Sequence, residues 1–202
     1  DDLVIKAYCW GRFLIMRQRF LDEIGQYLPR KGEVLDLGCG FGLFSLYYAL
    51  LRPELRLRGF DLNRRRIEVA TRAAAKIGLE NVHYEPGDVR EFSGEERFQA
   101  AYMLDIVHHI PRSAVRPLLE QIARCLPIGG RLVVKDVGDE PAYKRWFTFW
   151  LDKLMDPRTK VSYWSPAALQ TLLEKVGFEV YRHLMVDYLP YPHVLFACKR
   201  VR

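Results

Sequence analysis

A glycine-rich turn between an apolar strand and a helix is the feature that most constrains how this chain can fold. Residues 33–43 read Glu-Val-Leu-Asp-Leu-Gly-Cys-Gly-Phe-Gly-Leu, and residues 44–51 then follow a helical pattern. Glycines allow a tight turn and a close approach of the backbone to a ligand, and the N-terminus of the helix offers free N–H groups. The segment therefore predicts the start of a nucleotide-binding α/β unit.

The spacing of the glycines indicates which kind of nucleotide the turn binds. A dinucleotide fingerprint requires a third glycine where this chain has Leu43, and Gly42 comes one residue earlier. Asp36 stands two residues before Gly38, where a carboxylate suits a positively charged ligand and repels a pyrophosphate. The lysine motif of phosphate-binding loops is absent. A cationic nucleotide is favoured, with a dinucleotide as the alternative.

The pattern Asp-x-Gly-x-Gly-x-Gly resembles the first motif of class I S-adenosylmethionine-dependent methyltransferases. Their methyl donor carries an ammonium and a sulfonium and has no phosphate. The resemblance implies that Asp36, Gly38, Gly40 and Gly42 contribute to binding S-adenosyl-L-methionine. It also implies S-adenosyl-L-homocysteine as the product.

Strand and helix patterns alternate along most of the chain. Alternation predicts a parallel sheet, and the short connection near residues 187–192 predicts a final antiparallel hairpin. We expect an α/β, Rossmann-like seven-stranded sheet, mostly parallel with a C-terminal antiparallel hairpin and helices on both faces, which resembles the class I methyltransferase core over residues 30–200. The expected strands are 33–37, 55–61, 82–85, 98–104, 131–137, 178–186 and 193–199, and the expected helices are 3–28, 44–51, 64–77, 113–126, 143–155 and 166–177.

Composition narrows the class of protein without identifying a substrate. With 202 residues, half of them hydrophobic and 28% charged, the chain fits one globular domain. Its four cysteines are scattered, which favours free thiols over a zinc site or a disulfide framework and predicts a cytoplasmic, reducing compartment. No apolar run is long enough for a transmembrane helix. The net charge of +6 suits an acidic substrate, RNA or peripheral contact with a membrane, and does not decide among them. No metal site is expected, and the oligomeric state stays open.

The second strand ends on an acidic residue about 20 residues after the glycines. Ligands of open α/β sheets bind beyond the carboxyl ends of the strands, where such a carboxylate accepts ribose hydroxyls. Asp61 is therefore expected to bind the ribose, with a solvated turn residue as the alternative. By resemblance, Leu62 packs on the adenine.

The third and fourth strands end on acidic residues as well. By resemblance, Asp88 hydrogen-bonds the adenine amino group and the Val89 N–H hydrogen-bonds a ring nitrogen. Leu104 and Asp105 end the fourth strand and are expected in the same donor site. The joint pattern over four strand ends is more specific than any one motif.

The residues after the fourth strand indicate the class of acceptor. Methyltransferases that act on base amines or glutamine typically carry Asn/Asp-Pro-Pro-Tyr here, whereas residues 108–111 read His-His-Ile-Pro, which resembles the small-molecule branch. A histidine can take a proton from a hydroxyl, a phenol or an activated carbon. We expect His108, ahead of His109, to act as this base, with Asp136 orienting the imidazole. Alternatively, the histidines only shape the pocket, because methyl transfer to an aligned nucleophile needs mainly proximity.

Two segments are expected to cover the acceptor. Residues 1–30 form a predicted N-terminal helical lid, and residues 31–202 form the methyltransferase domain with an insertion at about 138–164. The insertion contains an amphipathic stripe of large aromatic residues beside basic ones, which suits a lipophilic acceptor, a membrane surface or simple core packing. The predicted acceptor-binding residues are Tyr8, Tyr143, Trp146 and Trp150.

These patterns lead to one functional hypothesis and two alternatives. The resemblance implies an S-adenosylmethionine-dependent methyltransferase that acts on an oxygen, carbon or nitrogen of a small, hydrophobic or lipid-like molecule. An RNA methyltransferase is the first alternative, although no RNA-binding module is recognisable and nucleic acid is not the expected partner. A non-catalytic partner subunit that retains the donor pocket is the second.

Overall fold

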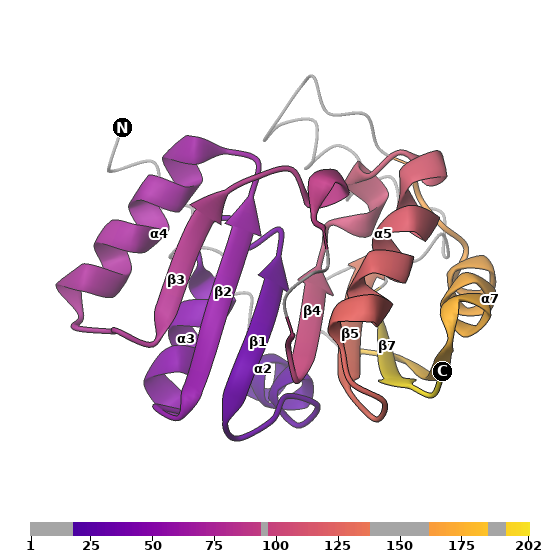
Figure 1. Ribbon diagram of the computed structural model, residues 1–202, viewed down its shortest axis with the longest axis horizontal. Helices are drawn as coiled ribbons and strands as arrows, with labels where there is room; N and C mark the ends of the chain where they lie inside the picture. The colour runs from indigo at the N-terminus through magenta and orange to yellow at the C-terminus, as the bar shows by residue number, and fades with distance from the viewer. Residues whose placement is uncertain (1–17, 94–96, 138–161, 186–192) are drawn as a thin grey trace.

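The computed structural model describes residues 18–93, 97–137, 162–185 and 193–202 (Figure 1). These residues form a seven-stranded sheet with the strand order β3-β2-β1-β4-β5-β7-β6. Strands β1 to β5 pair in parallel, and β7 pairs antiparallel with both β5 and β6. The predicted fold class, including the C-terminal antiparallel hairpin, is confirmed.

The elements follow the expected order along the chain. The strands are β1 (Gly32–Leu37), β2 (Leu55–Asp61), β3 (Val82–Pro86), β4 (Ala100–Leu104), β5 (Arg131–Val137), β6 (Phe178–Leu184) and β7 (His193–Arg200). The described α-helices are α2 (Gln18–Gly25), α3 (Leu43–Leu51), α4 (Arg64–Lys76), α5 (Arg112–Cys125) and α7 (Pro166–Val176). Two short 3₁₀ helices, η1 (Val89–Glu91) and η2 (Val107–His109), follow β3 and β4.

Differences from the sequence prediction have local causes. Strand β4 begins at Ala100, because the N–H of Phe98 donates instead to the carbonyl of Cys125 at the end of α5. The two 3₁₀ helices are too short to show a helical period in the sequence. Of the predicted helix over 3–28, the structure describes α2, and the part before residue 18 lies outside the described residues.

Helices cover both faces of the sheet, with α5 in front and α2 behind in the view of Figure 1. One face packs against α5 and α7 through a core that includes Leu35, Met103 and Val134. The opposite face packs against α2 and α3 through Val34 and Val133, among others. Because successive strand residues point to opposite faces, neighbours in one strand enter different cores.

The parallel strands bring their carboxyl ends to one edge of the sheet. The registers Leu37↔Phe60, Leu37↔Met103 and Leu104↔Lys135 align the ends of β1, β2, β4 and β5. The residues that follow these strands therefore meet at the same edge, where open α/β sheets bind their ligands.

Candidate active site

The glycine turn after β1 adopts a backbone that side chains would obstruct. Gly38, Gly40 and Gly42 all have positive φ, at 80°, 56° and 74°. A Cβ on Gly38 would lie 2.2 Å from Cδ1 of Ile106, which follows β4. By contrast, a Cβ on Gly40 would meet nothing within 4 Å. Gly38 thus permits close packing between two segments of the site, while Gly40 leaves open space above the turn.

Asp36 lies beneath this turn and not on its surface. Its side chain is 3% exposed, and the Tyr102 hydroxyl donates to its Oδ2 at 2.9 Å. Burial raises the pKa of Asp36 to about 7, although the hydrogen bond from Tyr102 opposes the shift. The predicted residue is therefore at the expected strand end, but its carboxyl group faces the core side of the turn.

Asp61, at the end of β2, binds the backbone of the glycine turn. Its Oδ2 accepts from the N–H of Gly40 at 2.9 Å, and its Oδ1 accepts from the N–H of Asn63 at 2.8 Å. The side chain is buried, whereas Leu62 beside it is 71% exposed. The carboxylate has further lone pairs for a ligand, and Leu62 presents an apolar surface next to it.

Asp88, after β3, is engaged by a residue that the sequence analysis missed. Oδ1 of Asp88 accepts from the N–H of Arg90 and caps η1, while the Arg90 guanidinium contacts both carboxylate oxygens, with 2.8 Å between Nε and Oδ2. These hydrogen bonds hold the pKa of Asp88 below its usual value. Val89, the next predicted contact, has a buried side chain. The spacing Asp-x-Arg was the available signal for this pair.

A buried lysine stands on the α2 face of the same edge. Lys135 of β5 is 2% exposed, and its Nζ lies 2.5 and 2.7 Å from the two carboxylate oxygens of Asp105. Asp105 follows Leu104, has φ of 58°, and its N–H donates to the Lys135 carbonyl at 2.8 Å. Lys135 was not predicted for the site, because a lysine that follows the apolar residues 132–134 is as compatible with an exposed strand end.

His108 and Asp136 form a buried pair on the opposite face. Nδ1 of His108 contacts Oδ1 of Asp136, and the His108 backbone N–H donates to Oδ2 of the same carboxylate at 3.0 Å. Both side chains are buried. The contact expected between the two strand ends is present, and the carboxylate fixes both the ring and the backbone of His108.

His109 presents the second imidazole of this segment. Its ring centroid lies 4.1 Å from that of His108, and its side chain is exposed. Despite that exposure, packing of the protein around the ring and the neighbouring His108 lower the pKa of His109 to about 4. The imidazole of His109 is therefore neutral at pH 7.

Residues that follow the 138–161 segment pack on this pair. The Tyr163 ring stacks on His108 with centroids 5.7 Å apart and an interplanar angle of 19°. The N–H of Ser162 donates to the His108 carbonyl at 2.7 Å, and Arg112 donates to the Tyr163 carbonyl at 2.7 Å. Four predicted acceptor residues, Tyr8, Tyr143, Trp146 and Trp150, lie outside the described residues.

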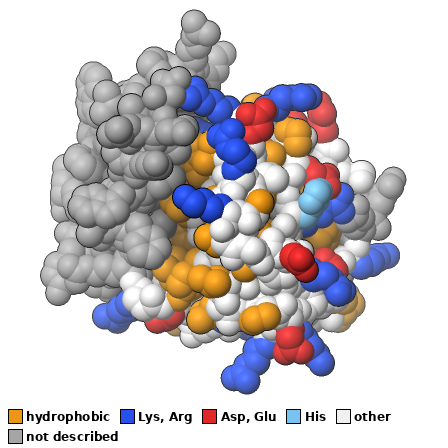
Figure 2. Space-filling view, turned by 90° about the vertical axis from the view of Figure 1, so that its left-hand side faces the viewer, with side chains coloured by type: hydrophobic (Ala, Val, Ile, Leu, Met, Phe, Trp, Pro, Cys, Tyr) orange, Lys and Arg blue, Asp and Glu red, His pale blue; other side chains and the backbone are white. Residues whose placement is uncertain are grey.

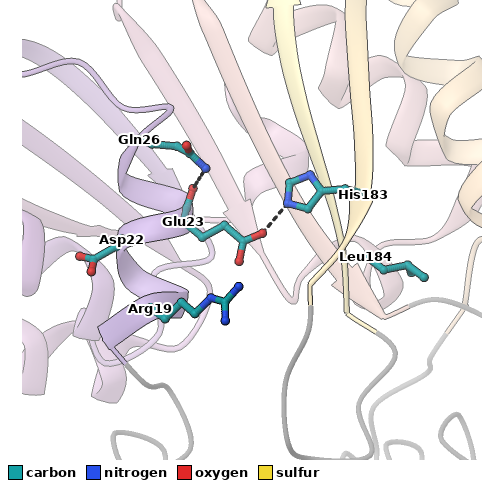
Figure 3. Close-up of a pocket in the computed structure, with 6 residues that line it drawn as sticks. All are labelled: Arg19, Asp22, Glu23, Gln26, His183 and Leu184. Atoms are coloured by element: carbon teal, nitrogen blue, oxygen red, sulfur yellow. Dashed lines mark hydrogen bonds and ion pairs between the residues drawn. The ribbon is translucent and has the colours of Figure 1, made fainter.

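A hollow of about 500 Å³ opens between α2 and the edge strand β6 (Figure 3). Glu23 and His183 are hydrogen-bonded across it. Its lining carries both signs of charge and includes none of the residues predicted for the donor site. The lining residues are Arg19, Asp22, Glu23, Gln26, His183 and Leu184.

Two kinds of feature are absent from the described residues. They contain no group of three or more histidine, cysteine or acidic side chains placed to hold a metal ion. Within the same part of the chain, no helix is both long and apolar enough to cross a bilayer. The face seen in Figure 2 carries lysine and arginine side chains interspersed with acidic and hydrophobic ones.

The sheet topology, the glycine turn and the acidic strand ends together define a Rossmann-like nucleotide-binding domain of the class I methyltransferase type. Residues 12–183 match the family model described as a methyltransferase domain. The chain therefore belongs to the methyltransferase-domain family.

Named relatives differ in the acceptors that their names state. The chain is 32% identical over 151 residues to demethylspheroidene O-methyltransferase of Rhodobacter capsulatus, a match that covers 72% of this chain and 36% of the relative. It is 31% identical over 126 residues to ribosomal RNA small subunit methyltransferase G of Deinococcus radiodurans, which covers 60% of this chain and 49% of the relative. The chain thus spans between a third and a half of the length of these relatives.

A solved structure supports the fold assignment. Magnesium protoporphyrin IX methyltransferase from Synechocystis PCC 6803, solved with bound S-adenosyl-L-homocysteine, superposes with a TM-score of 0.70 at 16% identity. The superposition covers 91% of this chain and 82% of that one. At this level of identity the likeness establishes the fold alone.

Proposed function

We propose that the protein transfers the methyl group of S-adenosyl-L-methionine to a small, hydrophobic or lipid-like acceptor. The observation that carries the proposal is the His108–Asp136 pair beside the exposed ring of His109, at the same edge of the sheet as the glycine turn. Methyl transfer to a hydroxyl or phenol benefits from a proton acceptor placed next to the donor. The O-methyltransferase relative supports this type of acceptor.

The donor would lie across the carboxyl ends of β1 and β2. The glycine turn, through Gly38, Gly40 and Gly42, allows the backbone to approach it, and Asp61 has lone pairs left for the ribose hydroxyls. The exposed side chain of Leu62 would pack on the adenine. S-adenosyl-L-methionine supplies a methyl group that its sulfonium already activates, so the chain needs mainly to align the reactants and exclude water.

Other predicted donor residues would act in less direct ways. Asp88 has to share its carboxylate between Arg90 and the adenine amino group, with the Val89 N–H as the second adenine contact. Asp36, two residues before Gly38, would hold the end of β1 to β4 through the hydrogen bond that it accepts from Tyr102. Leu104 ends β4 with a buried side chain and would form part of the floor.

The histidine segment would handle the acceptor proton. Asp136 receives the Nδ1 hydrogen of His108 and fixes that tautomer, which makes Nε2 the atom that can take a proton. His108 is buried, so His109 is the imidazole with a side chain open to an acceptor. We infer that the two adjacent rings act together, with Asp136 as the positioning residue and a ring nitrogen as the proton acceptor.

A labelling experiment tests the proposal. Purified protein is incubated with methyl-labelled S-adenosyl-L-methionine and whole-cell extract, and the products are partitioned between an organic phase, RNA and protein. Label in the organic phase is the expected result, and the labelled fraction is then identified by mass. Heat-inactivated protein is the control. Donor binding without any labelled product would contradict the proposal and favour a non-catalytic partner subunit.

RNA is the second candidate acceptor, because specific observations favour it. One relative is named for a ribosomal RNA methyltransferase, and α4 opens with Arg64, Arg65 and Arg66 at the donor edge of the sheet. The mixed charge on the face shown in Figure 2 is unlike the single-signed surface that RNA binding favours. Label in the RNA fraction would support this candidate over the first, provided that methylation of the RNA stops when the reaction is run at high salt.

A further inference from the structure

The strongest unexplained feature of the described residues is the buried Lys135. It follows the apolar residues 132–134 in β5, is 2% exposed, and its Nζ lies 5.4 Å from the centroid of the Phe20 ring of α2. A buried ammonium is costly unless it is paired, and an apolar residue of similar size would fill the same space without that cost. The lysine is paired with Asp105, at 2.5 and 2.7 Å from its two oxygens. Packing alone therefore does not explain why β5 carries a lysine at this position.

Asp105 is the part of this pair that reaches the ligand edge. Among the described residues other than glycine, Asp105 alone has a positive φ, at 58°. Its N–H donates to the carbonyl of Lys135, so both its backbone and its carboxylate are held by the same residue. Strained backbone of this kind clusters at ligand-binding positions. The Asp105 side chain is partly exposed, whereas the Lys135 side chain is not.

The pair also lies close to the glycine turn. Asp105 is followed by Ile106, whose side chain fills the space that a Cβ on Gly38 would need. Asp36 beneath the turn is buried against Tyr102, which leaves it enclosed on the core side. Asp105 is therefore the partly exposed carboxylate on the β4 side of the turn.

We propose that Lys135 is a positioning residue for the methyl donor: its buried ammonium fixes the Asp105 carboxylate at the end of β4, where that carboxylate receives the ammonium of the donor's amino-acid tail. The inference rests on the proposed function, because it requires the donor to bind at this edge. The tail is a zwitterion with no net charge, and the Asp105–Lys135 pair has no net charge either. Binding therefore brings ammonium to carboxylate without burying an unbalanced charge.

Two ligands separate a role in binding the tail from a general role in folding. S-adenosyl-L-homocysteine carries the amino-acid tail, whereas 5′-methylthioadenosine has the same adenosine and thioether without it. Isothermal titration calorimetry of Lys135→Met should show affinity for S-adenosyl-L-homocysteine reduced about tenfold to a hundredfold. Affinity for 5′-methylthioadenosine should change less than about twofold, because the adenosine contacts remain.

Val133→Ala is the matched control, because Val133 is fully buried in the same strand and faces the same side of the sheet. It should destabilise the fold and leave the ratio of the two affinities unchanged. If Lys135→Met does not fold, Asp105→Asn, which keeps the lysine and nearly the same shape, should produce the same selective loss.

Two results would overturn the inference while leaving the proposed function standing. One is an equal loss of affinity for both ligands in Lys135→Met and Asp105→Asn. The other is no loss for either ligand. A wild-type protein that binds neither ligand would overturn the proposed function, and this inference with it.

Discussion

Lys135 and Asp136 are neighbours in β5, but they serve opposite faces of the sheet with opposite charges. Lys135 holds Asp105 on the α2 face, and Asp136 holds His108 on the α5 face. In the first pair, the side chain of Asp105 stays partly exposed and its backbone has positive φ. In the second pair, both side chains are buried. Two successive strand residues thus clamp one short segment, residues 105–108, from both faces. The end of β5 can therefore organise a donor side and an acceptor side separately.

The largest expected effect comes from the acceptor side. Asp136→Asn keeps the shape of the side chain but removes the charge that fixes the His108 tautomer. We expect the rate of transfer of the labelled methyl group to the acceptor to fall about 10²–10⁴-fold. Affinity for S-adenosyl-L-homocysteine, measured by calorimetry, should stay within about twofold of the wild-type value. Unchanged turnover would show that the histidines only shape the pocket.

Substitutions in the glycine turn test the packing of Gly38 against Ile106, the second residue after β4. Gly38→Ala places a Cβ 2.2 Å from Ile106 at positive φ, so strain and overpacking should together lower the free energy of unfolding by about 2–5 kcal/mol. Gly40→Ala has the strain without the clash and should lose only about 1–2 kcal/mol. Urea unfolding measures both, and equal losses would contradict the packing of Ile106 on the turn.

Asp36 gives the stability of the folded protein a pH dependence of its own. Its pKa is raised to about 7 by burial, so between pH 4 and pH 7 the folded protein binds a proton that the unfolded chain has released. Its contribution to stability is therefore present below pH 4 and lost as pH rises towards 7, by at most about 4 kcal/mol. Asp36→Asn removes this slope. Thermal unfolding of both proteins at pH 5, 6 and 7 checks it, and parallel curves would contradict the buried position of Asp36.

The smallest effect is expected at the exposed pair after β3. Arg90 is half-exposed, so Arg90→Ala should leave the free energy of unfolding nearly unchanged. The pKa of Asp88 should rise towards its usual value, because Arg90 is what lowers it. Carboxylate titration by NMR measures this change. An unshifted Asp88 would indicate that the guanidinium contact is absent in solution.

The sequence predicted the strand ends and the acidic residues on them, because apolar runs and their breaks are local signals. It also predicted the meeting of Asp136 with the histidine segment, since adjacent parallel strands end at the same edge. The burial of Lys135 was not predictable in this way. A lysine at that position is as compatible with an exposed strand end, and its burial depends on Phe20 and Asp105, which are distant in sequence. The enclosed position of Asp36 likewise depends on Tyr102 from another strand.

The most direct test of this division of roles compares the two neighbouring residues of β5 in one measurement. Calorimetric titration of S-adenosyl-L-homocysteine into wild type, Lys135→Met and Asp136→Asn reports on the donor side alone. The account predicts affinity reduced at least about tenfold in Lys135→Met and essentially unchanged in Asp136→Asn. Equal affinities in all three proteins, or an equal loss in the two variants, would contradict a donor side and an acceptor side divided between these residues.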